Sequence, residues 1–522
     1  MILREMYFTS IKSGWSNLVF CILLLGIRPS LAQINQVARI ELPLLATETE
    51  YPKIATFKEK GIILYRTLLA PDANYVELQK LDTALKEQWK GAIMLDRKLS
   101  FFRAKTKEGF LVFLYWNKNS VTSNYQVLVV NEAKGSYGTY DINNAIPFNP
   151  TDFDVTGNSL IIGGYFNLRP IVLHYSFITK TTKVLPGYFN EPGEITELKA
   201  YINGSFDIIV RVKNAAKGKS LWLRNYDKEA NLKSTIVLNS ENRKNFIHGK
   251  SIQLENGNQL IAGTYGRNTE YARGLFFAVA DSTGRSKVNY YNFSELKKFF
   301  SFMRTRKEVR IRERITRRAS KGRQTTFSYR FILHDLIPFK NYFLLVAESY
   351  YPRYSYPTYS NRNFYNSAFT FNPYLNSNST YRGDYVFDGF QYTHAVVAGF
   401  NRRANLLWDN SLEINDIKNM QLEQHVKVLP TENRADLVYL FENILHTKVI
   451  KDSLVIAPKK SIPIQLSNDE EEAAKKDGAT NFLAYWYDDY LIASGVQRLR
   501  NKKLGRLGLE RRVFYINKLK QK

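Results

Sequence analysis

The sequence predicts an all-β protein built from seven or eight similar sheets that close into a ring. Three observations support this fold class. Short apolar segments of strand length recur along the chain, the turns between them begin with Asp or Asn, and similar segments return about every 40 to 50 residues. One such unit cannot cover both faces of its own sheet, so neighbouring units must cover each other.

The clearest unit lies between residues 256 and 293. Gln259 to Thr264 and Leu275 to Ala280 are apolar runs that are too short for helices. Residues Asp281 to Gly284 follow the second run and indicate a hairpin turn. An Asp side chain can bind the backbone two residues on, and Gly tolerates a positive φ, so the chain is expected to reverse there.

Weaker copies of this turn begin at Asp82, Asp227 and Asn401, each after a predicted strand and each with a small residue near the tip. The last copy, Asn401 to Trp408, resembles the blade repeat of the β-propeller superfamily, particularly its quinoprotein-like and other secreted bacterial branches. The resemblance implies a propeller architecture. No quinone-binding or catalytic motif of those branches can be carried over to residues of this sequence.

We divide the chain into eight candidate blades, at residues 52–93, 98–145, 150–187, 194–240, 246–293, 329–415, 424–465 and 480–518. A seven-bladed ring is the alternative, because the terminal strands Arg39 to Leu45 and Arg512 to Ile516 can share one blade and leave no sheet edge open. The predicted fold is therefore a seven- or eight-bladed β-propeller with a helical basic insertion and a long Tyr-rich loop.

Residues 1–32 have the pattern of a secretory signal, and residues 33–522 are expected to form one propeller domain. Arg4 and Lys12 precede the apolar run Leu18 to Ile27, and small residues precede Gln33. The run is too short to span a bilayer, although an uncleaved anchor is the alternative. Cys21 is the only cysteine, so cleavage would exclude thiol catalysis, disulfides and thiolate metal sites from the mature protein.

The net charge is +26, and removal of the predicted signal leaves +24. An exported protein this basic is expected to bind an anionic glycan, a lipid headgroup or an acidic envelope protein. Nucleic acid would also satisfy the charge, but the signal argues against it. The location is expected to be the periplasm, the cell surface or the medium, without a transmembrane helix in the mature chain.

The first insertion spans residues 293–328. Apolar residues recur at helical spacing at Leu296, Phe299, Phe300, Met303, Ile311 and Ile315, and ten basic residues but only two acidic ones lie between Arg304 and Arg323. We predict a helix that docks on the propeller and presents a positive arm. Its candidate anion-binding residues are Arg304, Arg306, Arg310, Arg314, Arg317 and Arg318. The alternative is a solvated helix without a ligand.

The second insertion spans residues 349–391 and contains nine tyrosines. Long loops in compact domains are usually functional or disordered, and Tyr suits both sugar stacking and protein contacts. The candidate binding residues there are Tyr351, Tyr354, Tyr356, Tyr359, Arg353 and Arg382. The alternative is a loop that packs over its own propeller.

Three histidines, His248, His334 and His425, stand 13 residues before Ile261, Ala347 and Val438 in successive candidate blades. Equivalent positions of neighbouring blades lie on one ring, so the three imidazoles could form a divalent metal or anion site. The alternative is that each bonds to a neighbour, because a register shift of one residue turns a side chain to the other face.

Recognisable enzyme motifs are missing, and no cofactor is predicted. Gly218-Lys219-Ser220 and Gly249-Lys250-Ser251 resemble the end of a phosphate loop, but neither has the earlier glycine or the strand-to-helix context. The sequence favours a non-enzymatic propeller that binds an anionic envelope ligand or protein partner. Two alternatives remain: a structural subunit of an envelope or secretion complex, and a carbohydrate-active enzyme on acidic glycans, whose carboxylates leave no local signature.

Overall fold

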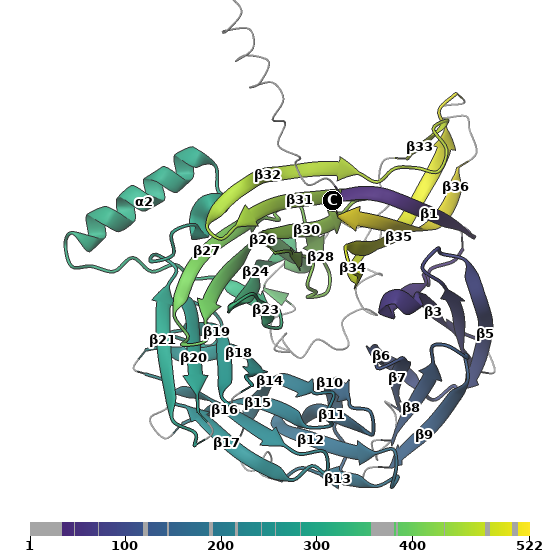
Figure 1. The fold of residues 1–522 in the computed structure, drawn as a ribbon, viewed down its shortest axis with the longest axis horizontal. Coiled ribbons are helices and arrows are strands. Elements are labelled where there is room, and N and C mark those ends of the chain that lie inside the picture. Colours follow the sequence, from purple (N-terminus) through teal and green to yellow (C-terminus); the bar gives the residue numbers. More distant parts are fainter. Residues whose placement is uncertain are drawn as a thin grey trace, which may run out of the picture.

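The computed structural model shows eight antiparallel sheets arranged in sequence order around a central axis (Figure 1), so the protein is an eight-bladed β-propeller. The structure describes residues 34–521 except for 46, 71–72, 118–123, 144–145, 187–191, 215–217, 242, 256, 282, 356–380, 383–384, 433, 475–480 and 504–509. The expected signal sequence, residues 1–32, lies outside the described residues.

Each of the first five blades has four strands. Blade 1 contains β2 (Lys53–Thr56), β3 (Ile62–Leu69), β4 (Asn74–Leu81) and β5 (Glu87–Leu95), with the short helix η1 (Lys58–Lys60). Blade 2 contains β6 (Ser100–Lys107), β7 (Phe110–Trp116), β8 (Asn124–Asn131) and β9 (Tyr137–Asn143). Blade 3 contains β10 (Asn149–Val155), β11 (Ser159–Phe166), β12 (Arg169–Ser176) and β13 (Thr182–Val184). Blade 4 contains β14 (Gly193–Ala200), β15 (Phe206–Lys213), β16 (Lys219–Tyr226) and β17 (Leu232–Leu238), and blade 5 contains β18 (Asn245–Gln253), β19 (Gln259–Gly266), β20 (Gly274–Ala280) and β21 (Ser286–Asn292).

The last three blades carry the departures from this plan. Blade 6 contains β22 (Arg330–Leu333), β23 (Ile337–Phe339), β24 (Tyr342–Ser355), β25 (Tyr381–Arg382), β26 (Tyr385–Asn401), β27 (Leu406–Glu413) and β28 (Lys418–Asn419). Blade 7 contains β29 (Lys427–Pro430), β30 (Ala435–Phe441), β31 (Ile444–Lys451) and β32 (Leu454–Pro463). Blade 8 contains β33 (Glu471–Ala473), β34 (Phe482–Tyr487), β35 (Tyr490–Asn501), β36 (Arg511–Gln521) and β1 (Ile34–Leu44).

The ring is closed by its two terminal strands, a pairing that the sequence offered only with the seven-bladed alternative and that the structure combines with eight blades. β1 is the outermost strand of blade 8 and pairs antiparallel with β36, with Ile40 opposite Ile516. This closure covers the free edge that β36 would otherwise expose. The indole Nε1 of Trp486 also donates a hydrogen bond to the carbonyl of Gly61 at 3.1 Å and joins blade 8 to blade 1.

The recurring Asp or Asn turn forms the hairpins that join β4 to β5, β16 to β17, β20 to β21 and β26 to β27. In each copy a side-chain oxygen of the first residue accepts the backbone N–H groups two and four residues later, at 2.7 to 3.1 Å. The residue three positions on has a positive φ of 61° to 85°, which favours small residues. The copies begin at Asp82, Asp227, Asp281 and Asn401.

The hydrophobic core is divided among the contacts between blades. The described residues form eight buried apolar clusters, and each cluster fills the space between two neighbouring blades. The cluster between blades 8 and 1 contains Trp486, Phe514 and Ile62. Inner strands such as β11 and β19 therefore bury both of their faces, as the repeat argument required, whereas outer strands such as β32 stay largely exposed.

The two insertions differ in detail from the prediction. In the first, the α-helix α2 (Thr305–Ala319) begins at residue 305, and the apolar stretch before it forms the short 3-10 helix η2 (Phe299–Phe302). In the second, the ends are not loop: β24 and β26 continue past the blade and pair as far as Ser355 and Val386. Two cross-strand aromatic pairs, Tyr350 with Phe390 and Tyr354 with Phe387, stabilise this extended hairpin.

Within the described ranges, none of the helices combines the length and the apolar character needed to cross a membrane.

Candidate functional site

The start of the first insertion is fixed to the outer edge of blade 6. The buried carboxylate of Asp409, on β27, accepts the backbone N–H of Lys297 at 2.8 Å and of Lys298 at 2.7 Å. The apolar residues expected to dock the insertion are fully buried between blades 5 and 6, namely Leu296, Phe299 and Phe300. Residues 296–300 therefore form a fixed base, from which the chain continues into α2.

One side of α2 packs on this base. Ile311 and Ile315 are half-buried and contact the cluster between blades 5 and 6. Arg312 donates hydrogen bonds to the carbonyls of Leu296 at 2.8 Å and Lys297 at 2.6 Å, and its guanidinium lies 5.0 Å from the centre of the Phe300 ring. Burial lowers the pKa of Arg312. This arginine holds the helix in place through its two backbone acceptors.

Six basic side chains on the remaining surface of α2 form what we call the arginine stripe. At about 100° per residue they fall within an arc of about 120° that excludes Ile311, Ile315 and Arg312. All six are exposed, and none makes an ion pair with a residue for which the structure gives a position. The stripe consists of Arg306, Lys307, Arg310, Arg314, Arg317 and Arg318, and Arg304 is exposed just before the helix.

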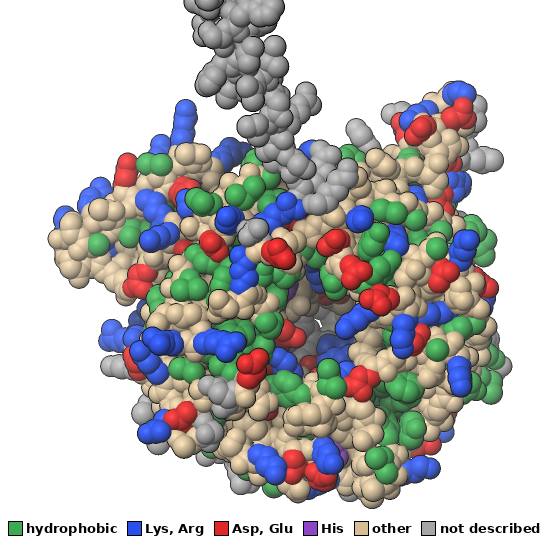
Figure 2. Space-filling view, in the orientation of Figure 1, with side chains coloured by type: hydrophobic (Ala, Val, Ile, Leu, Met, Phe, Trp, Pro, Cys, Tyr) green, Lys and Arg blue, Asp and Glu red, His purple; other side chains and the backbone are tan. Residues whose placement is uncertain are grey.

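The stripe is electrostatically costly for an isolated helix. Arg306 and Arg310, Arg310 and Arg314, and Arg314 and Arg318 are like-charged pairs four residues apart. Each such pair destabilises a helix by roughly 0.2 to 0.5 kcal/mol, or about 1 kcal/mol for the three. Figure 2 shows Lys and Arg side chains standing out from the projecting helix. An anionic partner would remove this repulsion.

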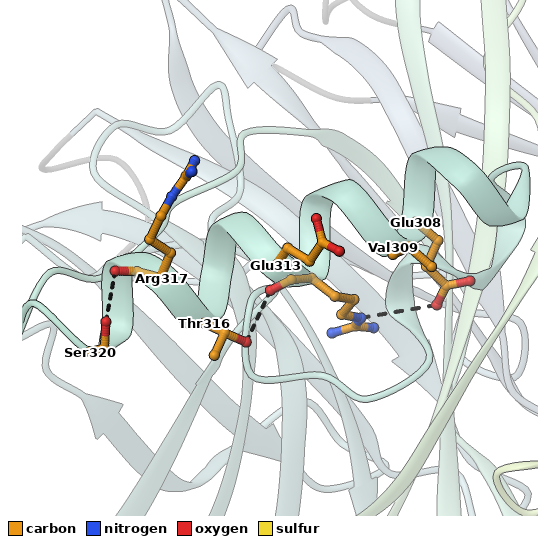
Figure 3. A pocket seen from close by; sticks show the side chains of 7 residues that line it. Glu308, Val309, Glu313, Thr316, Arg317 and Ser320 are labelled. Atoms are coloured by element: carbon orange, nitrogen blue, oxygen red, sulfur yellow. Dashed lines mark hydrogen bonds and ion pairs between the residues drawn. The ribbon is translucent and has the colours of Figure 1, made fainter.

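The opposite flank of α2 has a different character. An open depression of about 580 Å³ runs along it, lined by Glu308, Val309, Arg312, Glu313, Thr316, Arg317 and Ser320 (Figure 3). Both acidic residues of the helix lie here, and the hydroxyls of Thr316 and Ser320 donate to carbonyls of the helix itself. Both acidic residues of α2 therefore lie on a mixed flank, which shares Arg317 with the stripe.

The tyrosine-rich candidates are only partly within the described residues. Tyr351 is 48% exposed, Arg353 makes a 3.4 Å ion pair with Asp388, and Tyr354 packs on Phe387. The backbone of Arg382 belongs to β25. Tyr356 and Tyr359 lie outside the described residues. The described part of this insertion is an extended hairpin whose arginine is paired within the chain.

A second group of charges borders the central channel, where Figure 2 shows a hollow edged by basic and acidic side chains. It consists of side chains on the first strands of blades 2 to 5 and beside the first strand of blade 6. Asp152 on β10 accepts from Arg103 at 2.9 Å and lies 3.2 Å from the ammonium of Lys105. Blade 2 is thus linked to blade 3 by ion pairs at the channel.

Lys250, on β18, lies between two carboxylates from other blades. Its Nζ is 2.7 Å from Asp335 and 3.8 Å from Glu197. Burial opposes the charge of Lys250 and of Asp335, but their mutual attraction outweighs it, so the pKa of Lys250 is raised and that of Asp335 is lowered. Burial raises the pKa of Glu197, whose Oε2 accepts two hydrogen bonds from Ser251.

In the sequence, Lys250 stood out only as part of Gly249-Lys250-Ser251, which resembles the end of a phosphate loop but lacks its earlier glycine. The structure places Gly249, Lys250 and Ser251 inside strand β18, which agrees with the rejection of a phosphate loop. The link to Glu197 and Asp335 could not be found from a motif, because the three residues come from blades 4, 5 and 6. The sequence signal that could have indicated these channel charges is the alternation of charged and apolar residues along the first strand of each blade.

The structure brings together two of the three proposed histidines. His334 Nε2 lies 2.7 Å from the buried carboxylate of Glu348, which also accepts the backbone N–H groups of His425 and Val426 at 2.8 to 3.1 Å. His248 has other neighbours: burial, with Arg211 and Lys250 nearby, lowers its pKa to about 3.

Equal spacing along the sequence does not give these histidines equal register. His248 lies opposite Thr264, three residues past Ile261, next to a register shift in β18. The backbone N–H of His334 instead bonds to Val346, one residue before Ala347. In the part of the chain with assigned positions, no group of three or more His, Cys, Asp or Glu residues could hold a metal ion. The three histidines therefore do not form a metal-binding group among these residues.

No family model matches the sequence, and no curated protein matches it. Among solved structures, the chain resembles dihydro-heme d1 dehydrogenase NirN, with a TM-score of 0.40 and 10% identity over 92% of this chain and 78% of that chain. It resembles the β-propeller domain of the Trilobed protease from Pyrococcus furiosus, with a TM-score of 0.34 and 8% identity over 79% and 97%. It also resembles cobalt-substituted Synechocystis ACO, with a TM-score of 0.30 and 7% identity. That match covers 46% of this chain and 64% of the other, so this chain spans less than two thirds of the ACO chain. The sheet topology defines the class of the protein as a β-propeller.

Proposed function

We propose that this chain is an exported, non-enzymatic propeller that binds an anionic envelope ligand or protein partner through the arginine stripe. The observation that supports the proposal is the contrast between two sets of charges. The channel cations Arg103, Lys105 and Lys250 are paired with carboxylates of the same chain. The stripe has no such partners among the residues that the structure describes, so its charge is open to a ligand.

The position of α2 also suits a binding role. Figure 1 shows the helix projecting beyond the ring, where no blade screens it. Exposed charges act over about 8 to 10 Å at physiological salt, so an anionic partner would approach this helix without contacting the propeller first. Export is supported by the sequence pattern of residues 1–32.

The test is capture of the mature protein on the organism's envelope fraction across a salt series. A glutamine variant replaces four stripe residues: Arg310→Gln, Arg314→Gln, Arg317→Gln and Arg318→Gln. We expect the wild type to bind, added salt to release it, and the variant to lose binding. Equal binding of the two proteins would contradict the proposal.

A control variant replaces two exposed arginines elsewhere, Arg402→Gln and Arg403→Gln, in the turn of blade 6. This control should bind like the wild type, because it loses net charge but keeps the stripe. The material retained on the protein also separates two roles. An anionic glycan or lipid supports a ligand-binding role, whereas a protein in fixed stoichiometry supports a structural subunit of an envelope complex.

One observation favours a second candidate, an enzyme that acts on acidic glycans. Glu197 and Asp335 flank the same lysine at the channel, and their surroundings move their pKa values in opposite directions. Such pairs are typical of acid and base roles. Turnover of polygalacturonate by the wild type, lost in Glu197→Gln, would support this function. Absence of turnover by the wild type would exclude it for that substrate.

A further inference from the structure

The amino-acid composition of α2 and of Arg304 just before it indicates the kind of anion that would bind, beyond what the net charge of the helix indicates. From Arg304 to Ala319 the chain has seven arginines and one lysine, whereas the whole chain has 33 arginines and 41 lysines. A lysine ammonium carries the same charge as an arginine guanidinium, but it is a compact point charge without a preferred plane. An arginine guanidinium is a planar fork that binds the two oxygens of a carboxylate, sulfate or phosphate at once. The enrichment in arginine thus indicates recognition of oxyanion groups by geometry as well as by charge.

The stripe is also linear. Arg306, Arg310, Arg314 and Arg318 follow one another at four-residue steps, which corresponds to about 6 Å along the axis per step and about 22 Å for the whole helix. A single small anion could engage only one or two of these groups. A chain of anionic groups could engage them all.

A lipid bilayer is a less suitable partner for this helix. Helices that lie on membranes bury a free apolar side among the lipids. The apolar residues of α2, Ile311 and Ile315, already pack on the propeller. Val309 is 49% exposed, but it lies in the depression on the other flank of the helix. No apolar side chain is available within the stripe itself.

We infer that the arginine stripe is a binding site for a linear polyanion whose carboxylate, sulfate or phosphate groups are held by guanidinium forks. The inference rests on the proposed function and specifies its ligand. Arg312 is outside this site, because its fork binds backbone carbonyls of the base. Glu308 lies on the far side of the helix from the stripe, whereas Glu313 borders the stripe beside Arg317.

The experiment separates fork recognition from simple charge attraction. A lysine variant carries Arg306→Lys, Arg310→Lys, Arg314→Lys, Arg317→Lys and Arg318→Lys, and a second variant carries glutamine at the same positions. Calorimetric titration with heparin and with inorganic polyphosphate, each at several salt concentrations, gives affinity and its salt dependence. Vesicles of phosphatidylglycerol are the third probe, and circular dichroism checks that both variants keep the fold of the wild type.

We expect the wild type to bind a soluble polyanion, the lysine variant to bind it roughly tenfold or more weakly with a similar salt dependence, and the glutamine variant to lose binding. Equal affinity of the lysine variant and the wild type would overturn the inference while leaving the proposed function intact. Tighter binding to vesicles than to either polyanion, or no binding to either polyanion, would also overturn it. Undiminished envelope capture of the glutamine variant would refute the proposed function itself.

Discussion

The buried histidine His394 predicts that acid weakens the region that carries α2. Its side chain is fully buried, and its ring is stacked on Phe302 at 3.7 Å with edge contacts to Phe299 and Tyr329. Its Nδ1 is 2.9 Å from the hydroxyl of Thr393. Burial among aromatic rings lowers the pKa of His394 from 6.5 to about 3. The folded protein therefore holds this imidazole in its neutral form.

The direction of the pH effect on stability follows from the protonation of His394 in the folded and in the unfolded chain. Above pH 6.5 the imidazole is neutral in both the folded and the unfolded chain, so it adds no pH dependence. Below pH 6.5 the unfolded chain takes up a proton that the folded chain excludes down to about pH 3. One pKa unit corresponds to 1.36 kcal/mol, so the free energy of unfolding should fall by about 2 kcal/mol between pH 8 and pH 5 from this residue.

The variant His394→Phe isolates this contribution, because phenylalanine fits an aromatic cluster and does not titrate. Urea unfolding of both proteins at pH 8 and pH 5 gives the free energy of unfolding at each pH. The wild type should lose about 2 kcal/mol more than the variant on acidification. The variant Phe302→Leu is the control, because it disturbs the same cluster but keeps the titrating imidazole, so it should still lose stability on acidification.

Equal losses of stability by the wild type and His394→Phe would refute this reasoning. They would mean that the imidazole is protonated in the folded state at pH 5. In that case the ring would have to be solvated or paired with an acid, contrary to its stacking on Phe302.

Three further predictions follow from the contacts that hold the ring and its helix. Arg312→Ala removes two charged hydrogen bonds of roughly 1.5 to 3 kcal/mol each. We expect limited proteolysis to cut near α2 without a lower unfolding midpoint, whereas Arg310→Ala should show no cut. Glu348→Ala leaves His334 and two backbone N–H groups without their acceptor. The free energy of unfolding, measured with a denaturant, should fall by about 3 to 5 kcal/mol, and a fall of less than about 1 kcal/mol would contradict this prediction. Deletion of β1 (Ile34–Leu44) exposes the edge of β36 and should produce oligomers in light scattering, while a monomeric, equally stable product would show that ring closure is not needed.

The propeller itself was accessible from the sequence because its signals are local. The turns at Asp82, Asp227, Asp281 and Asn401 depend on hydrogen bonds between residues two and four positions apart, so a few side chains encode them. Repetition then implied mutual covering of the sheets, and pairing of the chain ends closed the ring. The number of blades was left at seven or eight, and the structure gives eight.

The insertion was predicted in outline and not in detail. The apolar spacing from Leu296 to Met303 suggested a helix, but these residues form a buried base with only the short helix η2. The extended backbone of Met303, with φ of −86° and ψ of 160°, separates η2 from α2. The charge run correctly placed the exposed basic residues on a helix. It could not show that Arg312 binds the base while Arg310 is exposed.

The contacts between blades were decided by the tertiary structure alone. Lys250 meets Glu197 and Asp335 from two other blades, and His334 meets Glu348 while His248 stands apart. These outcomes depend on register shifts and on hairpin lengths, which add one or two residues and turn a side chain to the other face. The sequence by itself thus determined the repeating unit and the ring, since their hydrogen bonds are local. Which charges pair and which stay open to a ligand was decided only when distant strands came together.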